Sequence, residues 1–250
     1  MDDPRRGQSV AARLGLLRHG LRTAVAAHDV YISYMRATAK WKSKVVWPTT
    51  EIVIEGYPRS GNTFAQVAFE VAQGRTVRMA HHTHAPAQVR WAVTHRIPTV
   101  LLIRPAEDAV ISYVIHDPHI PLGRALSDWI AFYESLIPMR NEVIVADFHR
   151  ATREFGAVIR RLNEVYGTSF KVFDSTEENI NRCYQTIEEL DRRHSKRQRI
   201  DETRVARPSD ARLPAKAALT IELKREVLSL PFKLARDLYL TFLNAHSVVS

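Results

Sequence analysis

The sequence predicts an α/β fold in three layers, with a central, mainly parallel β-sheet flanked by helices. Short apolar runs rich in β-branched residues alternate along the chain with segments whose apolar positions repeat at helical spacing. Strands that alternate with helices are typical of βαβ units, which build parallel sheets. The length of 250 residues suits one such domain.

Four strands are expected, one of them short. The three buried strands are expected over residues 52–54, 99–103 and 142–146. The short extra strand is expected over residues 77–80. Helices are expected over residues 62–73, 106–115, 123–137, 151–166, 176–192, 219–229 and 231–245. Ligands of parallel sheets bind beyond the carboxyl ends of the strands. The turns after residues 54 and 103 are therefore the places to look for chemistry.

Beyond residue 174 only helices are expected. Ser175 and Glu178 have the spacing of a capping box at the start of a helix. The polar stretch 193–218 reads as a loop, and its basic residues include Lys196, Arg197, Arg199, Arg204, Arg207, Arg212 and Lys216. The sequence therefore predicts a single domain over residues 49–250 with a helical C-terminal cap, preceded by a helical extension over residues 1–48.

The N-terminal extension is basic and carries apolar residues at helical spacing over residues 11–42, at Leu14, Leu17, Leu21 and Val25. Such a segment can be a surface helix that packs on the domain, or a helix that associates peripherally with a membrane or a partner. No window approaches the roughly 18 apolar residues of a membrane span, and the start does not read as a signal peptide. We expect no transmembrane segment and a cytoplasmic location.

Charge and cysteine content narrow the function classes only partly. Lysine and arginine outnumber aspartate and glutamate by 36 to 27, so the net charge is +9. Such a surplus attracts anions without choosing among nucleotides, glycans, nucleic acid or membranes. The single cysteine, Cys183, cannot form an internal disulfide and lies in a helical pattern, so we expect it to be structural.

One turn has the spacing of a phosphate-binding loop. Residues 56–63 read Gly-Tyr-Pro-Arg-Ser-Gly-Asn-Thr, the pattern G-x-x-x-x-G-x-[ST], between an expected strand and an expected helix. Glycines allow close approach of the backbone, and the helix N-terminus offers N–H groups to an anion. Asn62 stands where a nucleoside triphosphatase has lysine, and the cation is Arg59. This favours a ligand without a β,γ-phosphate pair and with less need for Mg²⁺.

The residues from Tyr57 to Phe64 resemble the 5′-phosphosulfate loop of the PAPS-dependent sulfotransferases, whose pattern is Tyr-Pro-Lys/Arg-Ser-Gly-Thr-Thr-Trp. Residues 103–113, with Arg104 and Ser112, resemble the 3′-phosphate segment of that family. The resemblance covers residues 50–165 and implies a P-loop-like sulfotransferase architecture. The donor-binding residues that it implies are Arg59, Ser60, Gly61, Asn62, Thr63, Phe64, Arg104 and Ser112.

Two elements depart from the family pattern. Asn62 replaces a threonine, and Phe64 replaces the tryptophan that the family places against the adenine. The later Arg-Lys-Gly segment is absent, and Arg207, Arg212 and Lys216 are the candidates to replace it.

A cluster of histidines lies between the two phosphate segments, in the sequence His81-His82-Thr83-His84-Ala85-Pro86. Two of these rings share one face of a strand, but no third ligand is near in sequence, so no metal is expected. The run from Thr83 to Pro86 resembles the family segment Lys-Thr-His-x-Pro, which implies that His84 is the catalytic base. By the same resemblance, Arg59 stabilises the leaving oxygen, and the family's lysine falls on His82. Glu55 is the alternative if the base is a carboxylate.

The resemblance implies transfer of a sulfuryl group from PAPS to a hydroxyl or amine of a small-molecule or carbohydrate acceptor, with release of PAP. Nucleic acid is not an expected partner. Two other functions stay open, a P-loop-type phosphotransferase or kinase and a non-enzymatic polyanion-binding protein. The acceptor is not specified, and the candidates for its pocket are Trp91, His116, His119 and Trp129.

Overall fold

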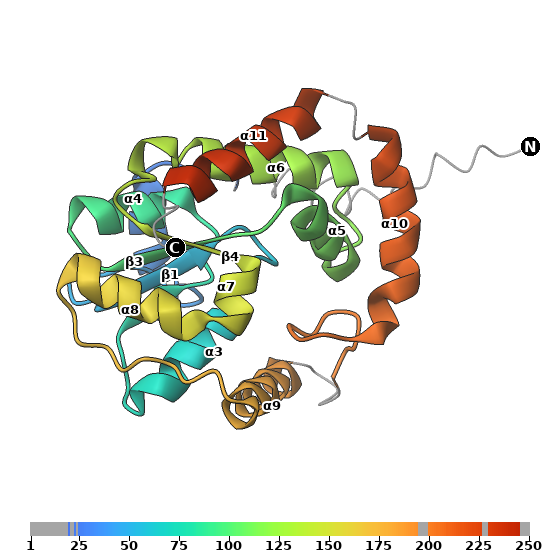
Figure 1. The fold of residues 1–250 in the computed structure, drawn as a ribbon. Helices are drawn as coiled ribbons and strands as arrows, with labels where there is room; N and C mark the ends of the chain where they lie inside the picture. Colours follow the sequence, from blue (N-terminus) through green and yellow to red (C-terminus); the bar gives the residue numbers. More distant parts are fainter. Residues whose placement is uncertain (1–19, 21–22, 24, 195–199, 227–229, 246–250) are drawn as a thin grey trace, which may run out of the picture.

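The computed structural model describes residues 20, 23, 25–194, 200–226 and 230–245, and its centre is a parallel β-sheet (Figure 1). The strands are β1 (Ile52–Gly56), β2 (Met79–His81), β3 (Thr99–Ile103) and β4 (Ile144–Asp147). Their order in the sheet is β2-β1-β3-β4, and each neighbouring pair is parallel. The predicted α/β class with a mainly parallel sheet is therefore confirmed.

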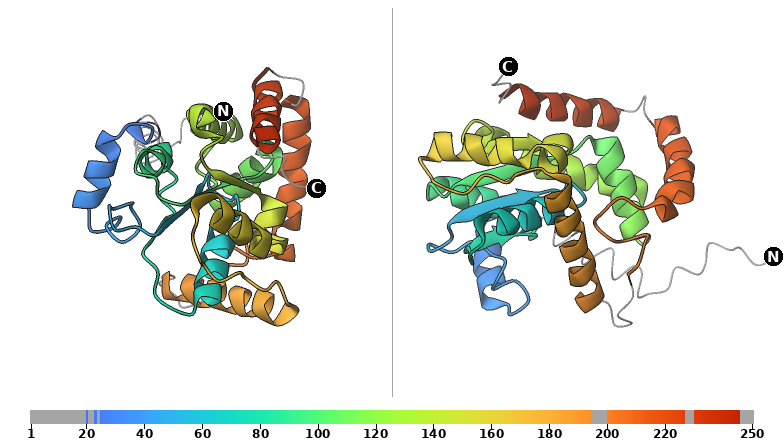
Figure 2. Two further views of the ribbon diagram at one scale, coloured as in Figure 1. Left: turned by 60° about the vertical axis from the view of Figure 1, so that its left-hand side comes forward. Right: turned by 60° about the horizontal axis from the view of Figure 1, so that its bottom comes forward.

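Helices cover both faces of this sheet, as the views of Figure 2 show. The helices are α2 (Val30–Ala37), α3 (Asn62–Gln73), α4 (Pro86–Thr94), α5 (Ala106–His116), α6 (Leu122–Glu134), α7 (Phe148–Arg153), α8 (Phe155–Tyr166), α9 (Glu177–His194), α10 (Leu213–Glu226) and α11 (Leu230–Ala245). Helices α3 and α8 pack on one face, in a cluster with Ile54, Val100 and Leu102, and α9 packs on α3. Helices α5, α6 and α11 pack on the other, against Leu101 and Ile103. The three predicted layers are present.

The helix predictions need three corrections. Helix α4 was not predicted. The single helix expected over residues 151–166 is two helices, because Asp147 caps α7 directly at the end of β4 by accepting a hydrogen bond from Arg150 N at 2.9 Å. Helix α9 is capped by Thr176, whose Oγ1 accepts from Asn179 N at 3.3 Å, rather than by the expected Ser175 box.

The described part of the N-terminal extension packs on the sheet. Ile32 and Met35 of α2 share a buried cluster with Ala87 of α4 and Val53 of β1. Val30 and Tyr34 on the outer side of α2 are exposed. Leu14, Leu17 and Leu21 of the amphipathic segment lie outside the described residues. In the part of the chain that is described, no helix is long and apolar enough to span a membrane.

The C-terminal segments close one side of the molecule (Figures 1 and 2). The polar stretch expected as a loop is partly helical, since α10 begins at Leu213 after a short 3₁₀ turn over Asp210–Arg212. Lys196, Arg197 and Arg199 lie outside the described residues. Cys183 of α9 is fully buried against α3, and burial raises the pKa of its thiol to about 11, which suits a packing role.

Candidate active site

Residues 56–63 form a loop, the anion loop, that begins where β1 ends. Two tyrosines, Tyr57 and Tyr133, hold the loop there. A Cβ on Gly56 would lie 2.5 Å from the carbonyl oxygen of Leu102, so only glycine allows β1 and β3 to approach this closely. Tyr57 is buried, and its hydroxyl donates to the carbonyl of Ala125 on α6 at 2.8 Å. Its N–H donates to the Tyr133 hydroxyl at 3.4 Å. The loop is therefore fixed to both the sheet and α6.

The loop then turns into the N-terminus of α3. Arg59 and Gly61 have positive φ angles of 67° and 94°, and Gly61 is the N-cap of α3. The first helical bond runs from Ala65 N to Gly61 O at 3.0 Å, so the N–H groups of the three residues between them precede the helical ladder. Unsatisfied N–H groups and the positive end of the helix dipole make this position suitable for an anion.

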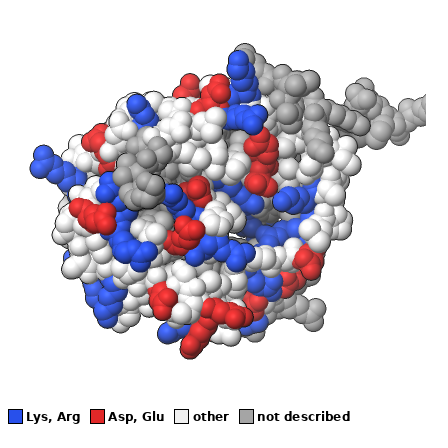
Figure 3. All heavy atoms as spheres, in the orientation of Figure 1, with Lys and Arg blue, Asp and Glu red and all other residues white. Residues whose placement is uncertain are grey.

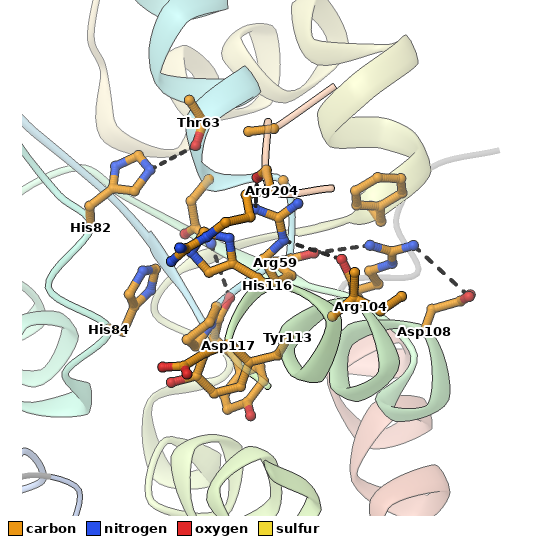
Figure 4. Close-up of a pocket in the computed structure, with 18 of the residues that line it drawn as sticks. Arg59, Thr63, His82, His84, Arg104, Asp108, Tyr113, His116, Asp117 and Arg204 are labelled. Atoms are coloured by element: carbon orange, nitrogen blue, oxygen red, sulfur yellow. Dashed lines mark hydrogen bonds and ion pairs between the residues drawn. The ribbon is translucent and has the colours of Figure 1, made fainter. Parts of the chain in front are cut away.

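The structure brings the two segments that are expected to bind phosphate together. Nε of Arg59 donates to the Ser112 hydroxyl at 3.2 Å, and Nη1 of Arg104 donates to the carbonyl of Arg59 at 3.1 Å. The Arg104 guanidinium also lies over the Phe148 ring, 4.1 Å from its centroid. Both arginines and Ser112 line one pocket, in which the labelled side chains of Figure 4 converge.

The pocket concentrates positive charge. Burial and the neighbouring Arg212, Arg104 and Arg204 lower the pKa of Arg59 to about 10, which leaves it charged at neutral pH. Burial also lowers the pKa of Arg104 and of Arg212. Figure 3 shows lysines and arginines gathered around a hollow in this face. Mutually repelling, partly buried cations fit a multiply charged anion that would compensate them.

His84 is attached to the start of the anion loop. Its Nδ1 lies 2.7 Å from the carbonyl oxygen of Gly56 and 3.5 Å from Oε1 of Glu55. A carbonyl oxygen can only accept a hydrogen bond, so Nδ1 carries the proton and Nε2 is the basic nitrogen of the neutral ring. His84 has a φ of 50°, a conformation uncommon for residues other than glycine.

Glu55 holds the turn that carries His84. Its side chain is fully buried, and its Oε2 accepts hydrogen bonds from Thr83 N, Thr83 Oγ1 and Gln88 Nε2 at 2.9, 2.7 and 2.8 Å. Its Oε1 accepts from Gly56 N at 3.2 Å. A carboxylate with these donors and no exposure orients its neighbours. It does not face the pocket as a base would.

The other two histidines face the first turn of α3. His82 Nε2 lies 3.1 Å from the Thr63 hydroxyl, and the Nδ1 atoms of His81 and His82 are 2.7 Å apart. Among the described residues, no cluster of three histidine, cysteine, aspartate or glutamate side chains could hold a metal ion. The contacts of these rings are hydrogen bonds with each other and with Thr63.

The pocket has a volume of about 1430 Å³, above the roughly 300–1000 Å³ of a site for one small ligand. Of the four residues expected around an acceptor, only His116 lines the pocket. Trp129 is buried in the core, Trp91 stacks on His95 with centroids 3.6 Å apart, and His119 is exposed elsewhere.

Two of the residues expected to bind the donor nucleotide, Ser60 and Phe64, differ in detail from that expectation. The Ser60 side chain is fully buried beside the Tyr133 hydroxyl, 3.4 Å away, so it faces the interior. Phe64 lines the pocket but is only 4% exposed, because it packs against Phe173 and Tyr184. Tyr184 of α9 is half-buried and also lines the pocket. No sequence pattern indicated Tyr184, because it belongs to no motif and lies far from the loop in the chain.

The basic C-terminal segment reaches the anion loop by its backbone. The carbonyl of Arg204 accepts from Arg59 Nη1 at 3.2 Å, and the Arg204 side chain lines the pocket. Arg207 is bound to Glu188 and Glu202, with nitrogen–oxygen distances of 2.6 and 2.8 Å.

The two other candidates for the missing Arg-Lys-Gly segment also line the pocket. Arg212 Nη1 donates to the carbonyl of Val205 at 3.3 Å, and Lys216 lies 3.4 Å from Asp108. Arg204, which was not among those candidates, and Lys216 are both exposed cations of this segment at the pocket.

Comparison with known proteins adds little. No family model and no curated protein matches this chain. Among solved structures, it is similar to the crystal structure of mouse sulfotransferase SULT7A1 complexed with PAP, with a TM-score of 0.42 and 13% sequence identity over 82% of this chain and 95% of that chain. At this TM-score the likeness supports no functional conclusion, and the function proposed below rests on the residues of this chain.

Proposed function

We propose that this chain is a PAPS-dependent sulfotransferase that transfers a sulfuryl group to a hydroxyl or amine of a small-molecule or carbohydrate acceptor and releases PAP. One observation carries the proposal: Nδ1 of His84 is bonded to the carbonyl of Gly56, the first residue of the anion loop. A base and an anion-binding helix terminus therefore share one pocket, together with the cations Arg59 and Arg104.

The residues present fit such a donor. The N-terminus of α3, with Gly61, Asn62 and Thr63, would hold the phosphosulfate end. Arg104 and Ser112 would hold the 3′-phosphate, because a guanidinium can form two hydrogen bonds with one phosphate. Phe64 and Tyr184 would offer ring surface to the adenine. The lowered pKa values of the arginines support this fit, since their charges lack full compensation within the protein.

When bound, PAPS supplies the activated sulfuryl group and the leaving phosphate. The protein's own part is to position, to accept a proton and to neutralise charge. Nε2 of His84 accepts the proton of the acceptor hydroxyl or amine as it attacks. Glu55, whose Oε1 lies 3.5 Å from Nδ1, stabilises the positive charge that then forms on the ring. Arg59 offsets the negative charge that develops on the leaving oxygen.

The two other functions are less well supported. A phosphotransferase of the P-loop type uses a lysine on the outer phosphates, and here Asn62 instead donates to the carbonyl of Tyr57 at 3.0 Å within the loop. Binding of a polyanion through the C-terminal segment would use its arginines, of which Arg207 is bound to two glutamates.

The test combines binding with transfer. Calorimetry without metal should show PAP binding more tightly than ATP with Mg²⁺, and ³⁵S from labelled PAPS should appear in an acceptor from an extract or compound panel, with unlabelled PAP suppressing the transfer. Binding of ATP with Mg²⁺ in preference to PAP would replace the proposal with a phosphotransferase. Salt-sensitive binding of DNA or heparin without PAP binding would replace it with a polyanion-binding protein.

The remaining expectations belong to the same proposal. Residues 49–250 would form the catalytic domain and residues 1–48 its extension. Catalysis would need no metal, nucleic acid would not be a partner, and the location would be cytoplasmic. A peripheral membrane contact through residues 11–42 stays a prediction.

A further inference from the structure

A chain of three polar side chains ends at the anion site. The Nδ1 atoms of His81 and His82 lie 2.7 Å apart. Nε2 of His82 lies 3.1 Å from the hydroxyl of Thr63, a contact that Figure 4 marks. Thr63 is in the first turn of α3 and lines the pocket, as do both rings. None of these contacts is needed by the His84 base, whose own Nδ1 bonds to Gly56.

The rings of His81 and His82, the two histidines of this hydrogen-bond chain, are both neutral at pH 7. Burial and the nearby Lys44 and His84 lower the pKa of His81 to about 4. Burial, His81, His84 and Lys44 lower the pKa of His82 well below its ordinary value. A neutral imidazole has one donor nitrogen and one acceptor nitrogen. Each ring therefore gives one hydrogen bond and receives one.

Only two arrangements satisfy both contacts. In the first, the Thr63 hydroxyl donates to His82 Nε2, and His82 Nδ1 donates to His81 Nδ1. In the second, His81 Nδ1 donates to His82 Nδ1, and His82 Nε2 donates to the Thr63 oxygen. Only the second leaves the Thr63 hydroxyl proton available for another acceptor. A phosphate or phosphosulfate at the α3 N-terminus is such an acceptor, because its ionised oxygens only receive hydrogen bonds.

We infer that His81 and His82 form a two-ring hydrogen-bond chain that directs the Thr63 hydroxyl proton to the 5′-phosphate end of the donor nucleotide. This inference rests on the proposed function, because it takes the anion at α3 to be that phosphate. Both rings are then positioning residues, and anion binding fixes their tautomers. His82 has a φ of 55°, uncommon for histidine, so the surrounding structure holds its ring in this position.

The first test needs no variant. Long-range ¹H–¹⁵N spectra of the protein labelled on its histidine rings report which nitrogen of each ring carries the proton. In the complex with PAP, His82 should be protonated at Nε2 and His81 at Nδ1. A His82 ring protonated at Nδ1, or at both nitrogens, in the PAP complex would overturn the inference.

The second test measures affinity with two nucleotides. Thr63→Val and His82→Asn should each weaken PAP by about tenfold, the usual effect of one hydrogen bond to a charged group. Adenosine 3′-phosphate, which lacks the 5′-phosphate, should bind the variants and the parent equally well. Asparagine is chosen at position 82 because it tolerates a positive φ. His119→Asn is the matched control, since His119 is exposed and outside the pocket.

The double variant, Thr63→Val with His82→Asn, distinguishes one connected hydrogen-bond chain from two independent contacts. Because Thr63 and His82 act on the same hydrogen bond, the double variant should lose no more affinity than either single variant. Losses that multiply, or equal losses for adenosine 3′-phosphate, would refute the chain while leaving the sulfotransferase proposal intact. A parent protein that binds neither nucleotide would instead refute the proposed function and this inference with it.

Discussion

Replacing Glu55 by glutamine removes the negative charge next to His84, the proposed base, and keeps nearly the same side-chain shape. Glu55 Oε1 lies 3.5 Å from Nδ1 of His84, and the carboxylate is fully buried. The amide oxygen of glutamine can still accept the hydrogen bonds from Thr83 and Gln88, and the bond lost with Oε1 is the 3.2 Å one from Gly56 N. The carboxylate should matter most when the ring becomes positive, because a neutral ring gains little from a nearby charge.

The size of the effect follows from the distance. Two unit charges about 4 Å apart interact by about 4 kcal/mol at an effective dielectric constant near 20. If about half of the proton has moved to His84 in the transition state, about 2 kcal/mol is lost. Each 1.36 kcal/mol is a factor of ten in rate, so Glu55→Gln should lower kcat by about 30-fold. PAP affinity should be unchanged, because Glu55 does not line the pocket.

Single-turnover transfer of ³⁵S from PAPS measures this step, with calorimetry of PAP as the binding control. Glu51→Gln is the matched variant, since Glu51 pairs with Arg75 away from the pocket. An unchanged transfer rate in Glu55→Gln would refute the role of the carboxylate. A loss as large as that of a variant without the His84 ring would instead identify Glu55 as the base.

Four further predictions follow from the same geometry. His84→Asn, in which asparagine tolerates the positive φ, should lower kcat by about 100- to 10,000-fold with PAP binding intact, and full activity would move the base elsewhere. Arg59→Ala should lower kcat more than PAP affinity, and an unchanged transfer rate would reject its role on the leaving oxygen. Arg104→Ala should weaken PAP by about 2–5 kcal/mol in calorimetry but AMP much less, since AMP lacks the 3′-phosphate; equal losses would contradict the assignment. Urea unfolding should show stability falling as pH drops from the ordinary histidine pKa of 6.5 toward 4, because His81 and His116, each with a pKa lowered to about 4, take up protons first in the unfolded chain. Stability that does not fall over this range would contradict the burial of both rings.

The parts of the fold and site that the sequence predicted are local in the chain. The strand before Gly56, the turn and the start of α3 occupy consecutive residues, so their spacing is visible without tertiary information. The buried strands are short apolar runs rich in β-branched residues, which is typical of a sheet covered on both faces. Helix α4 was missed because its residues are apolar around most of the helix, as it lies between the sheet and α2.

The parts that could not be predicted depend on partners distant in sequence. Glu55 was considered only as a weak alternative base, because its partners Thr83 and Gln88 are 28 and 33 residues away. Ser60 matches the family pattern, yet its hydroxyl lies beside Tyr133, which is 73 residues away. No pattern in the loop encodes which way a hydroxyl turns, because that depends on the tertiary packing.

Three consecutive residues at the end of β1 connect the elements of the proposed site. Glu55 holds the histidine turn, the Gly56 carbonyl holds the base, and Tyr57 fixes the loop to α6. Catalytic groups need placement within about half an ångström of their working positions. Glu55 and Gly56 pair with Leu101 and Leu102 of β3, and the Tyr57 hydroxyl bonds to α6, so these contacts hold the three residues together. Strand β1 therefore both presents the anion loop and fixes the distance from that loop to His84, the proposed base. This explains why the proposed base can lie on a short turn that follows the edge strand β2.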